Sequence, residues 1–486
     1  MKTSIQQLDC YFIPSEINAK SEKLVFHNNN SSIQLNVPKL EVNDLQKIIK
    51  IIRENRDRYV KKLSTNDIIS IIDRAIELWL DPNFIYRRLA EEYLPIITGY
   101  DGEMIHLFLS KYLRNFRKEK LQRMIEEDFP NPLVLDEFRP RRAGGLYRAY
   151  GPKMITHFFS GNVPGLPLYS LVAGMLVKSA TLGKVSSSEP LFPVLFTKTI
   201  EMVDPDFAKS MAIVWWKGGD ELLENKAFSQ TEAVIAYGSD QSIQAIERRI
   251  PSNVNFYPHG HKISFGVITK EALTRTLGKE AARRAAHDAS WFDQQGCLSP
   301  HVFFVEREGD YSPKEFMGML ANEMKNVETK MPRAKLSPSE NNLLIQARSK
   351  AEFQSFTNTR VAIIHSRNST AWTVVYREDE KFPLSTLNRF ITVVPIHSIE
   401  ELPEKLDPVR EYLQTAGVAS APARFQKVIN LLGELGVNRI CFLGNMSNPE
   451  PGWHHDGRCS IADLVRWVDV ESTVEETMDT FDPFRD

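Results

Sequence analysis

Cys297 is the residue of this sequence whose type and setting best suit covalent chemistry. It stands between a polar, glycine-containing approach and an apolar run of β-branched and aromatic residues typical of a strand, in DQQGCLSPHVFFVE, residues 293–306. A cysteine in this position is either a small buried hydrophobic residue or a thiol nucleophile. The chain contains only four cysteines, and we expect the other three, Cys10, Cys441 and Cys459, to be structural.

The composition argues against several classes of protein. With 486 residues the chain is long enough for two domains of roughly 150 to 250 residues. A net charge of -2, with 25% charged residues, does not favour binding of nucleic acid or another polyanion. The N-terminus lacks the apolar core of a signal peptide, and the longest apolar segment, residues 163–177, is shorter than the ~20 residues of a spanning helix. We therefore expect a cytoplasmic protein without a membrane span.

The pattern of apolar residues changes near Leu146. Before it, apolar residues at helical spacing predict amphipathic helices over residues 41–57 and 64–80, behind a polar start that we expect to lie at the periphery, outside the core. After it, short β-rich runs alternate with helices, which is typical of an α/β fold with mostly parallel sheets. Ser312 and Ser337 each precede a proline and have a glutamate three residues on, which predicts two helix starts.

Three of the β-like runs end in small residues and hydroxyls. At such strand ends the backbone N–H groups of an α/β sheet can bind phosphate or stabilise an oxyanion, although an ordinary turn explains each motif taken alone. The GxGxxG fingerprint of dinucleotide binding is absent from the sequence. The cysteines also lack the CxxC or Cys/His spacing of a zinc site, so we expect no metal. The three motifs are HFFSGNVPGLP at 157–167, LGKVSSSEP at 182–190 and YGSDQS at 237–242.

The order of these motifs relative to Cys297 resembles that of the aldehyde dehydrogenase superfamily. Members of that superfamily carry an Asn-aromatic-Pro motif, a Lys-Pro-Ser-Glu motif, a Gly-Ser after a strand, a Glu-Leu-Gly-Gly-Lys motif and a Gly-x-x-Cys loop. The resemblance is closer to the LuxC-type branch, the long-chain acyl-CoA (fatty acid) reductases, and there includes Cys-x-Ser-Pro at 297–300 and the late GWHHDGRCS segment. In the superfamily's order, this chain has Asn162-Val163-Pro164, Lys184-Val185-Ser186, Gly238-Ser239, a degenerate PHGHK at 258–262, and Gly296-Cys297.

The resemblance implies an α/β fold of the aldehyde dehydrogenase type, with a Rossmann-like cofactor domain, an α/β catalytic domain and an N-terminal helical region. We expect the helical region at residues 1–145, partly joined to a nucleotide-binding domain at 146–270. The catalytic domain is expected at 271–444, and a C-terminal segment, for oligomerisation or a return to the cofactor domain, at 445–486. The active site is expected in the cleft between the two α/β domains.

The resemblance also implies roles for particular residues. Cys297 matches the nucleophile, and Asn162 matches the side-chain donor of the oxyanion hole. Lys184 matches a contact to the adenosine ribose or 2′-phosphate, and Gly238 matches the turn facing the pyrophosphate. A free thiol titrates near pH ~8.5, so we expect the site to favour the thiolate. The residues expected to bind the cofactor are Ser160, Gly161, Lys184, Ser186, Ser187, Gly238, Ser239 and Gly260.

The sequence departs from the hydrolytic aldehyde dehydrogenases at one informative place. Where they have the glutamate that activates water, this chain has Pro258, followed by His259, Gly260 and His261. Without that base, an acyl-cysteine thioester survives for reduction or for transfer to another thiol. His259 or His261 is a candidate to assist the thiol or protonate the leaving group, although a histidine near a strand is commonly structural. Likewise, GWHHDG at 452–457 either lines a pocket or forms a solvated loop.

The resemblance and this departure together predict NADPH-dependent reduction of activated fatty acyl groups to long-chain aldehydes through an acyl-cysteine, with NADH as the alternative cofactor. The expected acyl donor is a fatty acyl-CoA or an acyl-protein synthetase. The LuxC-type branch also implies a homo-oligomer, which in luminous bacteria works with an acyl-protein synthetase and an acyl-transferase in bioluminescence. Two other functions stay open: a cysteine-dependent acyltransferase or thioesterase, and a non-catalytic partner subunit of an acyl-protein synthetase.

Overall fold

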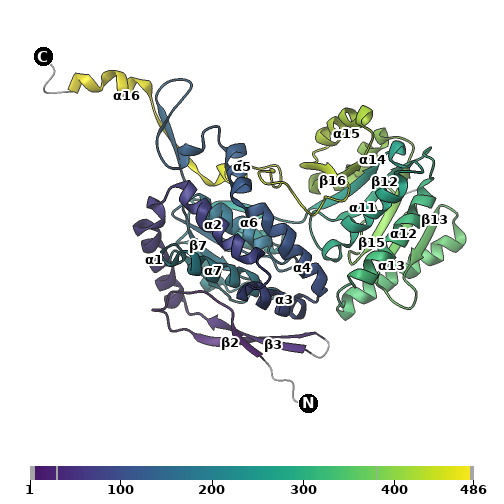
Figure 1. Ribbon diagram of the computed structural model, residues 1–486, viewed down its shortest axis with the longest axis horizontal. Coiled ribbons are helices and arrows are strands. Elements are labelled where there is room, and N and C mark those ends of the chain that lie inside the picture. Colours follow the sequence, from purple (N-terminus) through teal and green to yellow (C-terminus); the bar gives the residue numbers. More distant parts are fainter. Residues whose placement is uncertain (1–5, 29–30, 379, 482–486) are drawn as a thin grey trace.

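Two lobes and a smaller arm make up the protein. The computed structural model describes residues 6–28, 31–378 and 380–481. One lobe contains the N-terminal helices and a five-stranded sheet, and the other contains a seven-stranded sheet, with the arm leaving the first lobe near the C-terminus (Figure 1). Both large sheets are mostly parallel and carry helices on their faces, which confirms the expected α/β class.

The five-stranded sheet of the first lobe has the strand order β10-β9-β6-β7-β8, and all of its pairs are parallel. The central strands β6 and β7 are buried almost throughout, as expected for parallel strands covered on both faces. Because carboxyl ends of parallel strands meet at one edge, the loops after these strands come together there. The strands are β6 (Met154–Phe158), β7 (Ala180–Lys184), β8 (Met211–Val214), β9 (Ala233–Tyr237) and β10 (Asn255–His259), and the helices are α6 (Leu166–Leu176), α7 (Leu191–Val203), α8 (Pro205–Ala208), α9 (Glu221–Phe228) and α10 (Asp240–Glu247).

The N-terminal region packs onto this lobe. The two helices predicted from apolar spacing are confirmed, and the second begins with a capping box at Ser64. The expectation that the polar start stays outside the core is wrong, because Ile33, Leu35 and Val37 of β3 point into the same core as the helices. The elements are β1 (Gln6–Asp9), β2 (Lys20–Asn28), β3 (Ser31–Lys39), α1 (Val42–Arg58), α2 (Thr65–Leu80), α3 (Ile85–Thr98), α4 (Gly102–Lys111) and α5 (Lys118–Asp128).

The seven-stranded sheet of the second lobe has the order β13-β14-β15-β12-β11-β16-β17, with only the edge pair β13 and β14 antiparallel. Strand β11 pairs with β12 and β16, so the chain enters this lobe before Ile263, earlier than the expected boundary at 271. The helix starts predicted at Ser312 and Ser337 are confirmed, each with a complete capping box. The elements are β11 (Ile263–Ile268), α11 (Gly278–Ser290), β12 (Pro300–Glu306), α12 (Pro313–Lys330), α13 (Pro338–Thr357), β13 (Val361–His365), β14 (Thr373–Arg377), β15 (Phe390–Ile396), α14 (Leu402–Leu406), β16 (Leu413–Ala419), α15 (Pro422–Glu434) and β17 (Arg439–Phe442).

The C-terminal segment crosses back to the first lobe and then builds the arm. Ile461 and Leu464 join the core of the first lobe, and the chain continues as strand β18 (Arg466–Val470). This strand pairs antiparallel with β5 (Leu146–Tyr150), which pairs with β4 (Arg139–Pro140), and helix α16 (Ser472–Thr477) lies at the tip of the arm (Figure 1).

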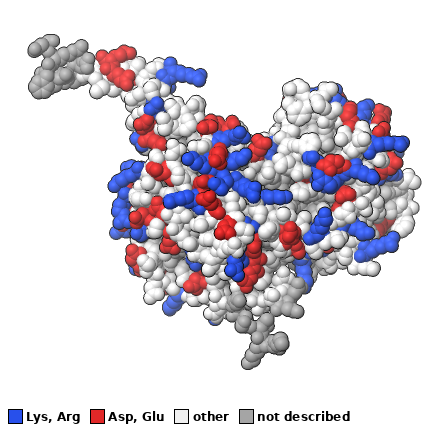
Figure 2. Space-filling model, viewed as in Figure 1, with Lys and Arg blue, Asp and Glu red and all other residues white. Residues whose placement is uncertain are grey.

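The surface has no single dominant sign of charge on the face in Figure 2, where Lys and Arg side chains are interspersed with Asp and Glu. This distribution agrees with the net charge of -2. Among the described helices, none has the length and apolar character needed to cross a membrane.

Candidate active site

A cleft of about 960 Å³ lies between the two lobes, at the carboxyl ends of the strands of the five-stranded sheet. Every residue that the sequence assigned to catalysis or cofactor binding lines this cleft, with the exception of Ser187. The Ser187 hydroxyl instead accepts a hydrogen bond from the indole nitrogen of Trp215 (3.0 Å). Motifs that are far apart in the sequence therefore share one site.

One end of the cleft has the features of a phosphate-binding cradle. Ser239 caps helix α10, where the first backbone N–H groups of the helix are free to meet an anion. The Ser160 hydroxyl is buried and lacks a hydrogen-bond partner in the described part of the chain. A Cβ on Gly161 would lie 2.1 Å from the Ser188 hydroxyl oxygen, so only glycine permits this close approach of the two loops. These hydrogen-bond donors and the glycine turn suit the phosphate groups of a dinucleotide.

Charged side chains lie in the same part of the cleft. Burial lowers the pKa of Lys184, and the nearby charge of Glu224 opposes that effect. Glu224 is 2% exposed, pairs with Arg249 and accepts a hydrogen bond from the Gly219 backbone N–H (3.1 Å). Around Glu224, Lys184 and Arg249 are two cations beside one carboxylate, and Asp240 adds a second carboxylate to the lining of the same cleft. Glu224 and Arg249 were not identified from the sequence, because neither belongs to a recognisable motif.

Cys297 follows a loop that is tied to the seven-stranded sheet. Its carbonyl oxygen accepts a hydrogen bond from the Ser264 hydroxyl (2.7 Å), which in turn accepts one from the Thr415 N–H (3.2 Å). Burial, and then the charge of Asp456, raise the pKa of the Cys297 thiol to about 12. The expectation that the site favours the thiolate is therefore wrong for the free protein, and the thiol needs a base.

The residues just before Cys297 form a strained turn, and a second strained turn packs against it and holds it in place. Residues 292–294 have φ angles of 45°, 51° and 67°, and residues 387–389 have φ angles of 61°, 59° and 62°, although none is glycine. The buried Arg389 guanidinium donates to the Asp293 carboxylate (2.8 Å), and the Gln294 side chain bonds the backbone of Phe390 on both its N–H and its C=O. These contacts maintain a backbone that would otherwise relax.

Asn162 connects the first lobe to the cysteine loop. Its side-chain amide nitrogen donates to the backbone carbonyl oxygen of Gln295 (2.9 Å). The backbone carbonyl oxygen of Asn162 accepts a hydrogen bond from the Tyr100 hydroxyl (2.6 Å). An asparagine amide carries two hydrogens, so one remains for an oxyanion while the other holds the side chain next to the loop.

His259 has the partner of a general base. Its Nδ1 lies 2.6 Å from the Asp456 carboxylate, whose other oxygen accepts from the Gln414 amide (2.8 Å). Burial raises the pKa of Asp456, but the hydrogen bond from His259 and the nearby His455 outweigh it and hold the pKa below its usual range. The carboxylate thus orients the imidazole as in other acid–base pairs. His261 has no such partner among the described residues, and its backbone N–H bonds Asp240 (2.9 Å).

Part of the GWHHDG segment lines a pocket and part of it is exposed to solvent, so each of the two interpretations offered by the sequence holds for some of its residues. His455 and Asp456 line the cleft, whereas His454 is exposed. The His455 ring stacks on His259 with ring centroids 4.4 Å apart, and burial lowers the pKa of His455 to about 3. The pairing of His259 with Asp456 carries no sequence signal, because the two residues are brought together only by the return of the chain to the first lobe.

A second cavity, of about 340 Å³ and mostly apolar lining, adjoins the cysteine loop. Phe108, Trp291 and Leu298 contribute to its wall. Gly296, the residue before Cys297, lines both this cavity and the cleft. The nucleophile candidate therefore lines the cleft directly beside the residue at which the cleft and the apolar cavity meet.

This fold is shared with solved aldehyde dehydrogenases. Aldehyde dehydrogenase 21 from Physcomitrella patens, solved with the product succinate, superposes with a TM-score of 0.75 at 10% identity, over 96% of this chain and 99% of that one. A glyceraldehyde-3-phosphate dehydrogenase from Methanocaldococcus jannaschii complexed with NADP gives 0.72 at 12% identity, over 93% and 99%. The protein thus has the aldehyde dehydrogenase-like fold, with a cysteine in its interlobe cleft.

The family is identified more narrowly by sequence. The family model described as acyl-CoA reductase (LuxC) matches residues 60–467, so the chain belongs to that family of oxidoreductases. The long-chain acyl-protein thioester reductase of Aliivibrio fischeri is 25% identical over 452 residues, which cover 91% of this chain and 88% of the relative. The protein of the same name from Vibrio harveyi is 25% identical over 427 residues, covering 85% and 84%.

Proposed function

We propose that this protein reduces activated long-chain fatty acyl groups to fatty aldehydes through a thioester on Cys297. The observation that carries the proposal is the position of Cys297, between a cleft with a phosphate-binding end and an apolar cavity. An acyl chain in the apolar cavity would present its carbonyl carbon to the thiol from the side opposite the cofactor. The relatives named long-chain acyl-protein thioester reductases support the same chemistry.

The reaction begins with transfer of the acyl group. His259, oriented by Asp456, accepts the thiol proton of Cys297 as the sulfur attacks the acyl carbonyl. The second amide hydrogen of Asn162 stabilises the oxyanion of the tetrahedral intermediate. The bond to the donor sulfur then breaks, His259 returns the proton to that sulfur, and the free donor thiol leaves an acyl-cysteine behind.

Reduction completes the cycle. When bound, a reduced nicotinamide supplies the hydride for the acyl carbon. The oxyanion formed on the acyl oxygen of the Cys297 adduct is again stabilised by Asn162. It collapses to the aldehyde and the cysteine thiolate, which regains a proton taken up from solvent through His259. Pro258 occupies the place of the water-activating glutamate, so the route to hydrolysis that depends on that glutamate is absent.

NADPH is the cofactor that we propose. The residues that would hold it are the Ser160–Gly161 turn, Lys184 and the N-terminus of α10 at Ser239. Lys184 and Arg249 together outnumber Glu224 in this region, which favours the additional phosphate of NADPH over the ribose hydroxyl of NADH. Both cofactors serve the same hydride chemistry, so a comparison of NADPH with NADH under equal conditions decides the preference.

The donor is proposed to be a fatty acyl thioester, either acyl-CoA or an acyl group carried by an acyl-protein synthetase. We further propose that the protein acts as a homo-oligomer and associates with such a synthetase and an acyl-transferase. The arm supports an assembly role, because Trp467, Val474 and Met478 expose apolar side chains on a part that projects from the body.

The four free cysteines support a reducing, cytoplasmic location.

The function is tested with purified protein, acyl-CoA thioesters of increasing chain length, and NADPH or NADH. Loss of nicotinamide absorbance, with aldehyde identified by mass spectrometry, is the expected result, and it should be strongest for long chains and NADPH. A pairing of Cys297 with His259 and Asp456 would also suit an acyltransferase or a thioesterase. Acyl transfer or free acid without nicotinamide oxidation would favour that alternative over reduction.

Replacement of Asn162 by alanine is expected to lower kcat by about 10²- to 10³-fold, equivalent to roughly 2.7–4 kcal/mol of barrier. The amide is the side-chain oxyanion donor, so KM for the acyl thioester should change much less than kcat. Steady-state kinetics with tetradecanoyl-CoA measure both constants. A variant with kcat close to that of the wild type would remove Asn162 from the oxyanion hole.

Replacement of His259 by asparagine is expected to slow acylation of Cys297 on the order of 10²-fold. Because the thiol is neutral in the free protein, alkylation of Cys297 by iodoacetamide should slow as well. Asp456→Asn should have a smaller effect, and adding it to His259→Asn should cost little more, since the two side chains act as one unit. His106→Asn, which changes an exposed histidine that lines neither cavity, serves as the control. Equal alkylation rates in the wild type and His259→Asn would argue against the base role.

A further inference from the structure

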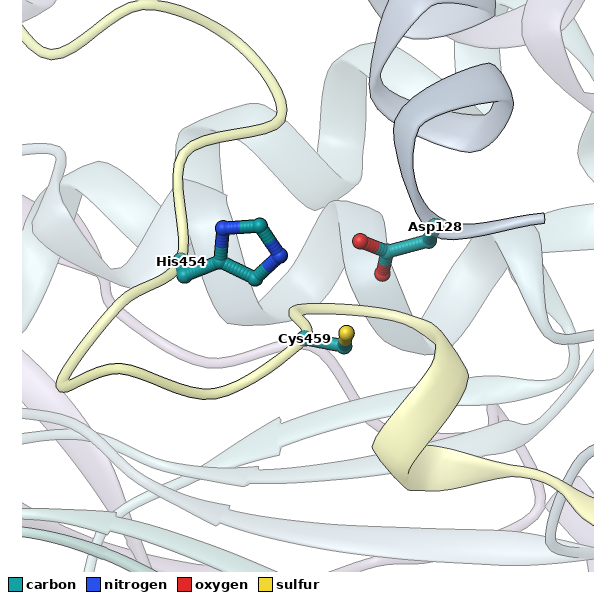
Figure 3. Close-up of side chains that lie close together, drawn as sticks. All are labelled: Asp128, His454 and Cys459. Atoms are coloured by element: carbon teal, nitrogen blue, oxygen red, sulfur yellow. The ribbon is translucent and has the colours of Figure 1, made fainter.

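Asp128, His454 and Cys459 converge at a place that belongs neither to the cleft nor to the apolar cavity. Each residue offers one ligand atom, and these atoms all lie within 4.8 Å of one another. In Figure 3 the imidazole and the carboxylate face each other across a short gap, and the cysteine sulfur lies beside the carboxylate. Asp128 ends helix α5, whereas the other two come from the loop after β17.

A small hairpin brings His454 and Cys459 together. The next residues inward, His455 and Arg458, form an antiparallel bridge, so His454 and Cys459 are the following cross-strand pair on the opposite face of that hairpin. Asp456 with φ of 54° forms part of the tight turn. In this way the face bearing His454 and Cys459 is directed at α5, while His455 and Asp456 of the same hairpin line the cleft.

The hairpin can lie against α5 because Gly452 lacks a side chain. A Cβ there would be 2.9 Å from the Glu127 Cγ and 3.5 Å from the Met124 Cα, and its φ of 84° also favours glycine. One oxygen of Asp128 accepts hydrogen bonds from the N–H groups of Ile461 (2.6 Å) and Ala462 (3.0 Å). These bonds fix the carboxylate and leave its other oxygen for a ligand, as outer contacts do in metal sites.

The ligand atoms are available for a cation. Within the described residues, neither the His454 ring nor the Cys459 thiol has a hydrogen-bond partner. The C-terminal end of α5, where Asp128 lies, adds the negative end of a helix dipole.

The other group of potential ligands, His259, His455 and Asp456, is different. There Nδ1 of His259 and the Asp456 carboxylate are already bonded to each other at 2.6 Å, and the two imidazoles are stacked. The atoms that a metal would need are therefore used for the acid–base pair.

We propose that Asp128, His454 and Cys459 bind one zinc ion, with water as the fourth ligand. One carboxylate oxygen, one imidazole nitrogen and one thiolate sulfur form a donor set that Zn²⁺ accepts in tetrahedral geometry, and the thiol proton is released to solvent on binding. Hard cations such as Mg²⁺ and Ca²⁺ prefer oxygen ligands and are disfavoured by the sulfur. The ion would clamp the hairpin that carries His455 and Asp456 to helix α5.

The sequence predicted no metal site, and the proposed zinc site differs from that prediction. Four residues separate His454 and Cys459, a pair that does not make a zinc motif without further nearby ligands, and the third ligand comes from a helix far earlier in the chain. Only the packing of the returning C-terminal segment against α5 assembles the three.

The test is a Zn²⁺ titration of the full-length, metal-free protein against a competing chelator dye, with stoichiometry checked by elemental analysis. The wild type is expected to bind one equivalent, and His454→Ala and Cys459→Ala are expected to bind at least about 100-fold more weakly. His454 is exposed and makes no side-chain hydrogen bond, so its replacement leaves folding intact. Saturating Zn²⁺ should also raise the Tm of the wild type but not that of His454→Ala.

Two control variants separate this site from other thiols and from the proposed catalysis. Cys441→Ala removes a partly buried cysteine outside the cluster, and Cys297→Ser removes the proposed nucleophile. Both should bind Zn²⁺ like the wild type, whatever their activity. Binding that is retained in His454→Ala and Cys459→Ala, or lost in Cys297→Ser, would overturn the proposal, as would a wild type that binds no Zn²⁺.

Discussion

Replacement of Cys297 by serine is expected to abolish both the attachment of acyl groups and the formation of aldehyde. A serine hydroxyl has a far higher pKa than a thiol, and its ester with the fatty acid is a poorer hydride acceptor than a thioester. The loss should exceed the roughly 10²- to 10³-fold effect of removing one oxyanion donor, because no covalent intermediate remains. Radiolabelled tetradecanoyl-CoA, followed by denaturing gel analysis, measures attachment, and nicotinamide oxidation measures turnover.

The matched control is Cys441→Ser, which changes another partly buried thiol that lies outside the cleft and the apolar cavity. It should keep full labelling and full aldehyde formation. Labelling that persists in Cys297→Ser would move the acyl group to another residue and would invalidate the role given to the cysteine loop.

The second large effect is expected from the ion pair beneath that loop. Arg389 is fully buried and donates to the Asp293 carboxylate at 2.8 Å, so Arg389→Met leaves a buried carboxylate without its partner. Breaking such a pair costs about 3–5 kcal/mol in the free energy of unfolding. The strain of three left-handed residues at 292–294, of order 1–3 kcal/mol each, is then opposed by fewer contacts, chiefly the Gln294 bonds to Phe390.

Thermal unfolding followed by circular dichroism should show a Tm lowered by roughly 5 °C or more in Arg389→Met. Below that Tm, the rate of Cys297 alkylation should also change, because the turn that positions the thiol relaxes. Glu54→Gln, which removes an exposed i,i+4 partner of Lys50, should leave both measurements unchanged. A Tm equal to that of the wild type would mean that the two turns hold their conformation without the ion pair.

Sequence patterns were sufficient where the structure depends on neighbours in the chain. The helix starts at Ser64, Ser312 and Ser337 could be predicted because a cap needs only four consecutive residues. The strands after Leu146 could be predicted because burial on both faces leaves continuous apolar runs. In the N-terminal region the same method failed, since the polar composition concealed the inward alternation of β3.

In the candidate site, too, the features that depend on neighbouring residues could be predicted from the sequence. Asn162 and the loops after β6, β7 and β9 could be found from the sequence, because each follows a strand of the parallel sheet and such strand ends share one edge. Cys297 could be found because it shortly precedes the apolar run of β12. Their order along the chain, compared with a known superfamily, added the chemistry that spacing alone did not contain.

Only the tertiary structure decided how the site is tuned and supported. Asp456 meets His259, Arg389 meets Asp293, and Asp128 approaches the His454 hairpin, each across a long separation in the chain. The sequence indicated the candidate nucleophile and determined the parallel sheets, since these depend on local residue types and on periodicity. Polar partners that meet through long-range packing leave no periodic signal, because each contact depends on where two separately folded segments come to lie.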